Sequence, residues 1–360
     1  MTAVFEENLR LNKEETARGA LELRSRPLNL LFTANTFCNL ECIMCSRANK
    51  PGQLSAAAVE KLSALFPYLR DLNIQGGEPL LVPWLDDCLE RAARFPDMRK
   101  YVNTNGLLID AKRADLFALA EVFLIWSIDS PRRDTYEYIR RGARYEQLLS
   151  ALAAIKEANK KAGRAPRKEL NAVVMRSNAG HIEEFLPFAV EHQFEVINFA
   201  PILFNEKSDE DIFTHGTPQE LQALRDAIAR TAQAADRAGI RVQSSVPGTV
   251  FTLRPWDEHK QPPAPEQRVK PAIPAPAPVL CRMPWRQLFV DLLREDHVNP
   301  KNVFPECFCP HPLGNIEHDS IEELWNGPAM QAYRRKLLEG DVSAQCNPAC
   351  LQRLSRQRFQ

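Results

Sequence analysis

The stretch Cys38-Asn39-Leu40-Glu41-Cys42-Ile43-Met44-Cys45 places three cysteines at x3 and x2 spacing, shortly after the apolar run at residues 30–35. That run predicts a buried strand, so the cysteines lie on a loop at a strand end. Cysteine thiolates hold [4Fe–4S] clusters, and a cluster ligated throughout by protein normally takes four. Three ligands leave one iron with an open position, as catalytic zinc sites keep one for chemistry. The spacing therefore indicates a reactive iron–sulfur cluster, although alone it also fits zinc.

A second motif follows about 30 residues later, where the apolar run 69–75 leads into Gly76-Gly77-Glu78-Pro79. Together the two motifs resemble the radical S-adenosylmethionine (radical SAM) superfamily, whose signature is CxxxCxxC after the first barrel strand and GGEP at the end of the second. The resemblance implies that three irons are bound by Cys38, Cys42 and Cys45, and that S-adenosylmethionine takes the fourth. It also implies that the amino group of this cofactor is contacted by Gly76, Gly77, Glu78 and Pro79. Met44 is a small departure, because relatives often have an aromatic residue there.

The same resemblance implies weaker contacts with S-adenosylmethionine at later strand ends, at Ser127, Asp129, Arg140 and Asn178. Ser127 and Asp129 match an SxDG-like segment whose usual glycine is replaced by a serine. Arg140 falls in a predicted helix over residues 132–158, where relatives place an arginine that can pair with a carboxylate. The alternative for Arg140 is a solvated surface side chain. The turn at residues 103–106 either lines the pocket or is only an Asn-Gly turn.

Short apolar strands alternate with amphipathic helices from residue 30 to about residue 245. Six strands are predicted, at residues 30–35, 69–75, 100–104, 122–128, 170–175 and 195–200. Such alternation specifies a parallel sheet covered by helices, with the chemistry at the carboxyl ends of the strands. Six units match the partial (β/α)6 TIM-like barrel of the resembled superfamily. The predicted fold class is α/β, with an N-terminal extension over 1–29, the barrel over 30–245, a proline-rich connector over 246–279 and a small domain over 280–360.

The predicted C-terminal domain carries five cysteines: Cys281, Cys307, Cys309, Cys346 and Cys350. The order of Cys-Arg-Met-Pro-Trp at 281–285, Leu-Gly-Asn-Ile at 313–316, Leu-Trp-Asn-Gly at 324–327 and the closing cysteine pair resembles the auxiliary-cluster modules called SPASM and twitch. This resemblance implies one auxiliary [4Fe–4S] cluster, held by Cys281, Cys307, Cys346 and Cys350. Cys309 is then a buried thiol, an alternative ligand to Cys307 or a catalytic hydrogen-atom donor. A zinc site that includes Cys307, Cys309 and His311 is a further alternative.

Composition excludes several function classes. Acidic and basic residues balance at 46 each, so nothing indicates a nucleic-acid partner. No stretch approaches the roughly 18 apolar residues of a membrane span, and the start lacks an apolar signal core. We therefore expect a cytoplasmic protein without a membrane partner. Its nine cysteines then indicate metal or redox use rather than disulfides, while Cys88, at helical spacing from leucines, is expected in the core.

Three functions fit these features. The first is a radical SAM enzyme with two [4Fe–4S] clusters, which cleaves S-adenosylmethionine to a 5′-deoxyadenosyl radical and abstracts hydrogen from a small, sugar-type molecule for epimerisation or oxidation. The second is a peptide or protein maturase of the ribosomal-peptide or sulfatase type. Relatives of that kind often carry an added recognition domain, for which the roughly 30 residues before the first strand leave no room. Both enzymes would need an electron donor such as flavodoxin or ferredoxin. The third is a non-catalytic, zinc-stapled protein.

Overall fold

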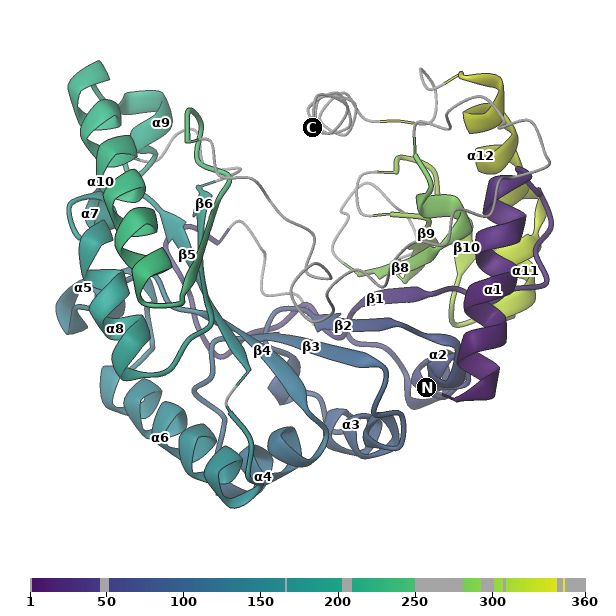
Figure 1. Cartoon of the computed structure of the whole chain (residues 1–360), viewed down its shortest axis with the longest axis horizontal. Helices are drawn as coiled ribbons and strands as arrows, with labels where there is room; N and C mark the ends of the chain where they lie inside the picture. The colour runs from purple at the N-terminus through teal and green to yellow at the C-terminus, as the bar shows by residue number, and fades with distance from the viewer. Residues whose placement is uncertain are drawn as a thin grey trace.

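The computed structural model describes residues 2–45, 52–165, 167–202, 209–249, 281–292, 301–306, 309–341 and 346 of the chain. Its centre is a sheet of ten strands in the order β10-β9-β8-β1-β2-β3-β4-β5-β6-β7. Figure 1 shows this sheet curving into an open arc with helices on its outer side. Over the described residues, no helix is both long and apolar enough to cross a membrane.

Seven strands that pair in parallel make up the barrel: β1 (Asn29–Thr33), β2 (Asp71–Gln75), β3 (Arg99–Thr104), β4 (Val122–Ser127), β5 (Lys168–Val174), β6 (Val196–Pro201) and β7 (Arg241–Ser244). The predicted α/β partial barrel is confirmed, because β1 to β6 are each followed by helix. The seventh strand is absent from the sequence prediction. Its four residues are largely polar and only half-buried for the most part, so no apolar run marks it.

Helices follow the strands on the outer face: α2 (Ala56–Ser63), α3 (Leu85–Ala93), α4 (Ala111–Leu119), α5 (Arg133–Ile139), α6 (Tyr145–Lys161), α7 (Arg176–Ala179), α8 (Phe185–Glu191), α9 (Ile212–His215) and α10 (Pro218–Arg237). Several begin at a side chain that caps the first turn, such as Ser55 at α2 and Asp110 at α4. The predicted single helix over 132–158 is wrong. The segment forms α5 and α6, because Gly142 between them adopts a φ of 90°, which a helix cannot include.

The hydrophobic core lies between the sheet and these helices. On β2, Leu72 and Ile74 are fully buried within it. Cys88 on α3 is 2% exposed and belongs to the same core, as expected. Successive residues of a strand point to opposite faces, so Asn73 and Gln75 face the inside of the arc. The outer face of the sheet is therefore apolar and the inner face carries polar groups.

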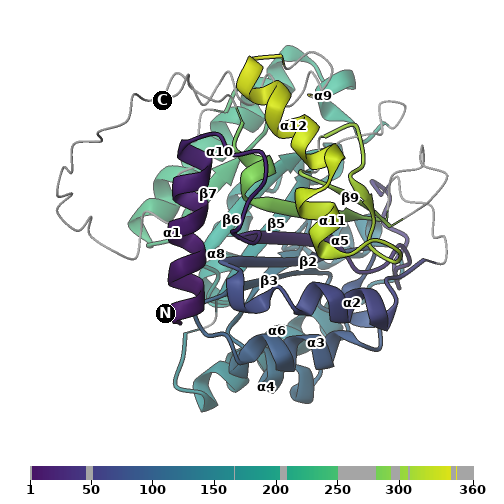
Figure 2. The ribbon, with the colours of Figure 1, turned by 90° about the vertical axis from the view of Figure 1, so that its right-hand side faces the viewer.

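The C-terminal part of the chain continues the barrel sheet. Strand β8 (Gln287–Asp291) pairs in parallel with β1, and β9 (Asn302–Phe304) and β10 (Gly314–Asn315) follow as antiparallel strands. Helices α11 (Ile321–Asn326) and α12 (Pro328–Glu339) lie outside these strands (Figure 2). The cysteine-bearing segment that begins at residue 281 is therefore built onto the β1 edge of the barrel.

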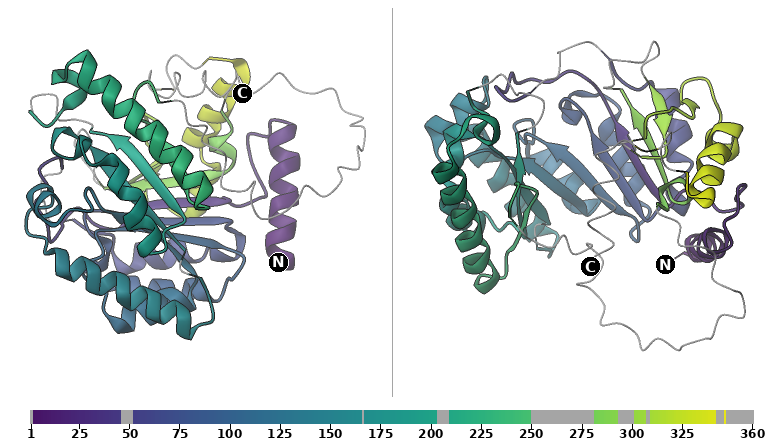
Figure 3. Two further views of the ribbon diagram at one scale, coloured as in Figure 1. Left: turned by 60° about the vertical axis from the view of Figure 1, so that its left-hand side comes forward. Right: turned by 90° about the horizontal axis from the view of Figure 1, so that it is seen from above.

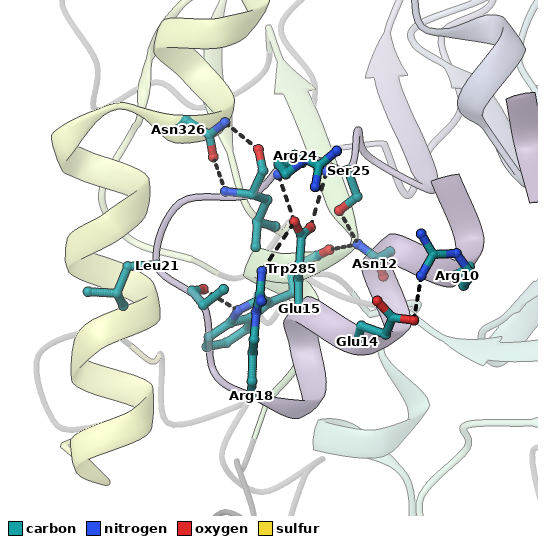
Figure 4. A network of polar contacts seen from close by, with 12 residues as sticks. Arg10, Asn12, Glu14, Glu15, Arg18, Leu21, Arg24, Ser25, Trp285 and Asn326 are labelled. Atoms are coloured by element: carbon teal, nitrogen blue, oxygen red, sulfur yellow. Dashed lines mark hydrogen bonds and ion pairs between the residues drawn. The ribbon is translucent and has the colours of Figure 1, made fainter. Parts of the chain in front are cut away.

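The N-terminal residues are tied to this C-terminal part. Helix α1 (Ala3–Ala17) lies at the same end of the sheet as α11 and α12 (Figures 1 and 3). Polar contacts join them in what we call the terminal network, formed by Asn12, Glu15, Trp285 and Asn326 with the loop after α1 (Figure 4). Asn326 donates to the carbonyl oxygen of Leu23 and accepts from its amide, at 2.8 and 2.9 Å. Both carboxylate oxygens of Glu15 accept backbone amides of that loop.

Candidate active site

A cavity of about 640 Å³ opens at the carboxyl ends of the barrel strands. Its volume lies within the range of small-molecule sites. It is lined by most of the residues predicted to bind a cluster or S-adenosylmethionine, namely Cys38, Cys42, Cys45, Gly76, Gly77, Glu78, Ser127 and Arg140. The end of β6, at Ala200, Pro201 and Ile202, forms another wall. No sequence motif marks these three residues. What predicts a place for them in the site is their position at the end of the predicted strand over residues 195–200.

The cysteine loop is anchored to the end of α5 by backbone bonds. The amide of Glu41 donates to the carbonyl of Arg141 at 3.0 Å, and the amide of Ile43 donates to that of Ile139 at 2.9 Å. Burial raises the pKa of the Cys42 thiol to about 11. Because iron binds the thiolate, loading a cluster here would release protons. Three thiols facing one cavity fit the ligand set of a cluster with an open iron.

The glycine turn after β2 presses against the start of the cysteine loop. The amide of Gly77 donates to the carbonyl of Asn35, and the amide of Glu78 donates to that of Phe37, both at 2.9 Å. A Cβ on Gly77 would lie 2.0 Å from the carbonyl oxygen of Phe37, and one on Gly76 would lie 2.4 Å from Oδ1 of Asn35. No side chain fits at either position, so both require glycine. The two motifs found in the sequence are thus in direct contact.

Glu78 connects this turn to the end of β3. Its side chain accepts hydrogen bonds from Oγ1 of Thr104 at 2.7 Å and from the amide of Asn105 at 2.8 Å. Burial raises the pKa of its carboxyl group. Asn105 also donates to Oδ1 of Asn39 in the cysteine loop at 2.8 Å. The β3 turn therefore lines the cavity and holds the cysteine loop, whereas Pro79 is buried and does not line the cavity.

Arg140 reaches the cavity from the end of α5. Its side chain is 7% exposed and pairs with the fully buried carboxylate of Asp129 at 2.7 Å, which excludes the surface alternative. Asp129 also accepts from the amide of Val173 at 2.8 Å. Asn178 donates to the carbonyl oxygens of Asp129 and Val173, both at 2.8 Å. Asp129 and Asn178 thus support Arg140 without lining the cavity, and their direct contact with a cofactor remains a prediction.

Three C-terminal cysteines fall within the described residues, and each is partly exposed: Cys281, Cys309 and Cys346. Cys307 and Cys350 lie outside them, so the four-ligand set and the catalytic role of Cys309 remain predictions. Cys281 leads into the buried Trp285, whose indole N–H donates to the carbonyl of Ala20 at 2.8 Å. In the part of the chain that the structure describes, no three His, Cys, Asp or Glu side chains are arranged to hold a single metal ion.

Comparison with known proteins identifies two domains. Residues 33–189 match the radical SAM superfamily, and residues 281–351 match the iron–sulfur cluster-binding domain called SPASM. The chain therefore carries a radical SAM domain, followed by a SPASM domain. Both the predicted superfamily and the predicted enzyme class are confirmed. The two domains imply [4Fe–4S] clusters and S-adenosylmethionine as cofactors of this radical SAM protein, as expected, and they favour an enzyme over a zinc-stapled protein.

Its relatives in sequence include GTP 3′,8-cyclases. The protein is 31% identical over 164 residues to that of Geobacter sulfurreducens, and 28% identical over 221 residues to that of Streptomyces coelicolor. These matches cover 43% and 56% of this chain. The chain spans about half of the first relative and three fifths of the second, at 49% and 61% of their lengths.

Solved structures share its fold. The crystal structure of Streptococcus suis SuiB bound to the precursor peptide SuiA has a TM-score of 0.60 at 15% identity, covering 91% of this chain and 71% of that one. Native anSMEcpe with bound AdoMet has a TM-score of 0.56 at 17% identity, covering 86% of this chain and 84% of that one. At such identities the likeness establishes the fold alone.

Proposed function

We propose that this radical SAM protein cleaves S-adenosylmethionine reductively and abstracts a hydrogen atom from a small, sugar-type substrate, which is then epimerised or oxidised. The observation that carries the proposal is the shared cavity. Three thiols, the glycine turn and a buried arginine face one space of small-molecule size. When bound there, the cluster and S-adenosylmethionine supply a 5′-deoxyadenosyl radical, while the protein supplies binding and orientation.

The side chains around the cavity have separate roles in this proposal. Iron is bound by Cys38, Cys42 and Cys45. Arg140, oriented by Asp129, pairs with the carboxylate of S-adenosylmethionine, since an arginine fork suits a carboxylate. Glu78 accepts a hydrogen bond from the amino group of S-adenosylmethionine. Ser127 lines the wall near the ribose, and the supporting bonds of Asn178 fix the loop that carries Asp129.

GTP is the substrate named for the sequence relatives, but the cavity does not favour it. A triphosphate carries several negative charges and is usually held by several Arg or Lys side chains. Among the described residues that line the cavity, Arg140 alone is a Lys or Arg, and in this proposal it is engaged by the carboxylate of S-adenosylmethionine. We therefore propose an uncharged substrate in place of a nucleotide.

A peptide substrate is the second candidate. SuiB, which shares the fold, is seen with a precursor peptide. With either substrate the auxiliary cluster would be held by Cys281, Cys307, Cys346 and Cys350. In an oxidation it would accept the electron of the substrate radical. In an epimerisation Cys309 would return a hydrogen atom to the substrate radical, and the external electron donor would reduce the thiyl radical that remains. We propose flavodoxin or ferredoxin as the electron donor.

Anaerobically purified protein tests the proposal. Two cubanes predict about eight irons per chain, and reduced protein is expected to convert S-adenosylmethionine into 5′-deoxyadenosine. Cys42→Ala removes a predicted iron ligand and should abolish this product, whereas Cys350→Ala should retain it. Cys88→Ser is the matched control, because Cys88 is buried in α3 and does not line the cavity. Normal 5′-deoxyadenosine formation by Cys42→Ala would contradict the ligand assignment.

A further inference from the structure

The inner face of the barrel sheet carries a group of side-chain amides that we call the amide belt: Asn73, Gln75, Asn103, Asn171, Asn198 and Gln243. Strand registers connect its members. Asn171 is the partner of Asn198, which is in turn the partner of Gln243. Asn171 is also the partner of Ser127, which lines the cavity together with Gln75 and Asn103. The belt therefore shares the face of the sheet that bounds the proposed cofactor site.

The fold leaves hydrogen-bonding capacity in this belt. In the described structure, the Oδ1 atoms of Asn73 and Asn103 are buried without a hydrogen-bond partner. Asn198 donates to Oδ1 of Asn171 at 2.7 Å, so two of the amides orient each other. Nearly all buried polar groups in folded proteins have a partner. Asn103 also lines the cavity, so its unsatisfied amide points to a ligand that supplies the missing group.

Positive charge is scarce where this face bounds the cavity. Arg140 is the sole Lys or Arg among the described residues of the cavity wall, and in the proposed function it is engaged by the carboxylate of S-adenosylmethionine. Further from the cysteine loop the same face holds charges of both signs, at Asp71, Arg99, Glu169 and Arg241. Arg99 is ion-paired with Asp71 at 2.5 Å. A phosphate group would find few unneutralised cations here.

An aromatic pair adjoins the belt. Tyr101 is the register partner of Asn73 on one side and of Phe123 on the other. The two rings pack edge to face with centroids 5.5 Å apart. Phe123 is buried and supports the ring of Tyr101, which is partly exposed. A partly exposed ring beside groups that both donate and accept hydrogen bonds suits a molecule with apolar C–H faces and many hydroxyls. A sugar ring has this combination.

We propose that the amide belt binds the substrate, and that the substrate is an uncharged, polyhydroxylated carbohydrate without phosphate. The inference rests on the proposed function, since the hydrogen to be removed must face a cofactor in the same cavity. Each hydroxyl both donates and accepts, as does each amide of the belt. The belt spans β2, β3, β5, β6 and β7 of a concave face (Figure 1).

Deuterium transfer tests the class of substrate. Cells of the source organism are grown in D2O, and their extract is separated by anion exchange into unretained and retained fractions. Each fraction is added to reduced holoprotein with unlabelled S-adenosylmethionine, and deuterium in 5′-deoxyadenosine is measured by mass spectrometry. Label is expected from the unretained fraction. Periodate, quenched before the protein is added, should abolish it because it cleaves vicinal diols, whereas protease should leave it unchanged.

The other outcomes overturn the proposal in distinguishable ways. Label that comes from the retained fraction, or that protease removes, indicates an anionic or a peptide substrate. Protein that forms 5′-deoxyadenosine but takes label from no fraction also contradicts the inference while leaving the proposed function standing. Protein that forms no 5′-deoxyadenosine contradicts the proposed function itself, and the inference with it.

Two substitutions locate the binding surface. Asn103→Leu and Asn198→Leu remove the amide but keep the number and branching of side-chain heavy atoms. Each should raise at least tenfold the amount of active fraction needed for half-maximal transfer, because a bound hydroxyl loses its partner. Asn159→Leu on α6 is the matched control and should shift it less than twofold. Iron content and thermal unfolding establish that each variant is folded, and Asn103→Asp provides an isosteric second variant. Belt variants that behave like the control would overturn the assignment.

Discussion

The terminal network and the amide belt both contain buried polar atoms, but they satisfy them differently. In the terminal network, the side chain of Asn326 both donates a hydrogen bond to the backbone of Leu23 and accepts one from it. Both carboxylate oxygens of Glu15 accept backbone amides. In the amide belt, Asn73 and Asn103 bury side-chain oxygens without a partner. An unsatisfied buried group costs about 1–3 kcal/mol. The contrast indicates that the first region stabilises the fold and that the second is kept for a ligand.

The largest expected effect is a loss of activity, caused by a substitution that displaces the wall of the cavity. Gly77→Ala places a Cβ 2.0 Å from the carbonyl oxygen of Phe37, immediately before the cysteine loop. We expect 5′-deoxyadenosine formation to fall at least 100-fold, since misplacing groups by about 1 Å can cost that much, together with a loss of iron. Gly180→Ala is the control, because its Cβ would meet nothing within 4 Å. Equal iron and activity in both variants would show that the close contact is not required.

A substitution in the terminal network should lower the stability of the fold. Asn326→Leu removes both bonds to Leu23 and leaves that backbone unit buried without partners, which should lower the free energy of unfolding by about 2–4 kcal/mol. Urea unfolding measures this loss. The control is Asn159→Leu, whose side chain bonds only within its own helix. A loss below about 1 kcal/mol would mean that the terminal network is not a stabilising region.

Sequence motifs predicted the cysteine loop and the glycine turn of the cavity far better than they predicted the terminal network. The cysteine loop and Gly76–Glu78 are short local segments, and their contact follows from adjacent parallel strands. The terminal network joins residues about 270 to 300 positions apart, such as Asn12 with Trp285 and Leu23 with Asn326. Their identities carry no local signal, because an asparagine in a helix is equally compatible with solvent. The parallel pairing of β8 with β1 could not be predicted from the sequence for the same reason.

Lys168 offers a third kind of buried polar group, unsatisfied and not beside the cavity. Its Nζ is buried on the outer face of β5 without a hydrogen-bond partner, 5.1 Å from the ring centre of Phe194. Burial lowers its pKa to about 7 from 10.5. The unfolded chain therefore binds more protons between pH 7 and 10.5, so stability rises with pH across that window. Lys168→Met should raise stability at pH 7 by on the order of 2 kcal/mol.

Urea unfolding at pH 7 and pH 9.5 checks this sign. The wild type should gain stability between the two values, and Lys168→Met should gain less. A residual slope is expected from Lys100, whose pKa burial lowers to about 8. Glu169, whose pKa burial raises to about 7, acts below this window. Lys160→Met on the exposed side of α6 should retain the full slope, and an unchanged slope in Lys168→Met would exclude Lys168 as its source.

The smallest effect on stability is expected from a substitution of Asn103. It directly tests the comparison between the amide belt and the terminal network. Asn103→Leu removes an oxygen that has no partner in the described structure, so the free energy of unfolding should stay equal or rise by up to about 1 kcal/mol. The same substitution at Asn326 should cost several times more in the opposite direction. Because both changes replace an asparagine whose side-chain oxygen is buried with leucine, measuring them together in urea reduces the effect of side-chain type. A comparable loss at Asn103 would mean that its amide is held by the fold, and that the belt is a structural network like the terminal one.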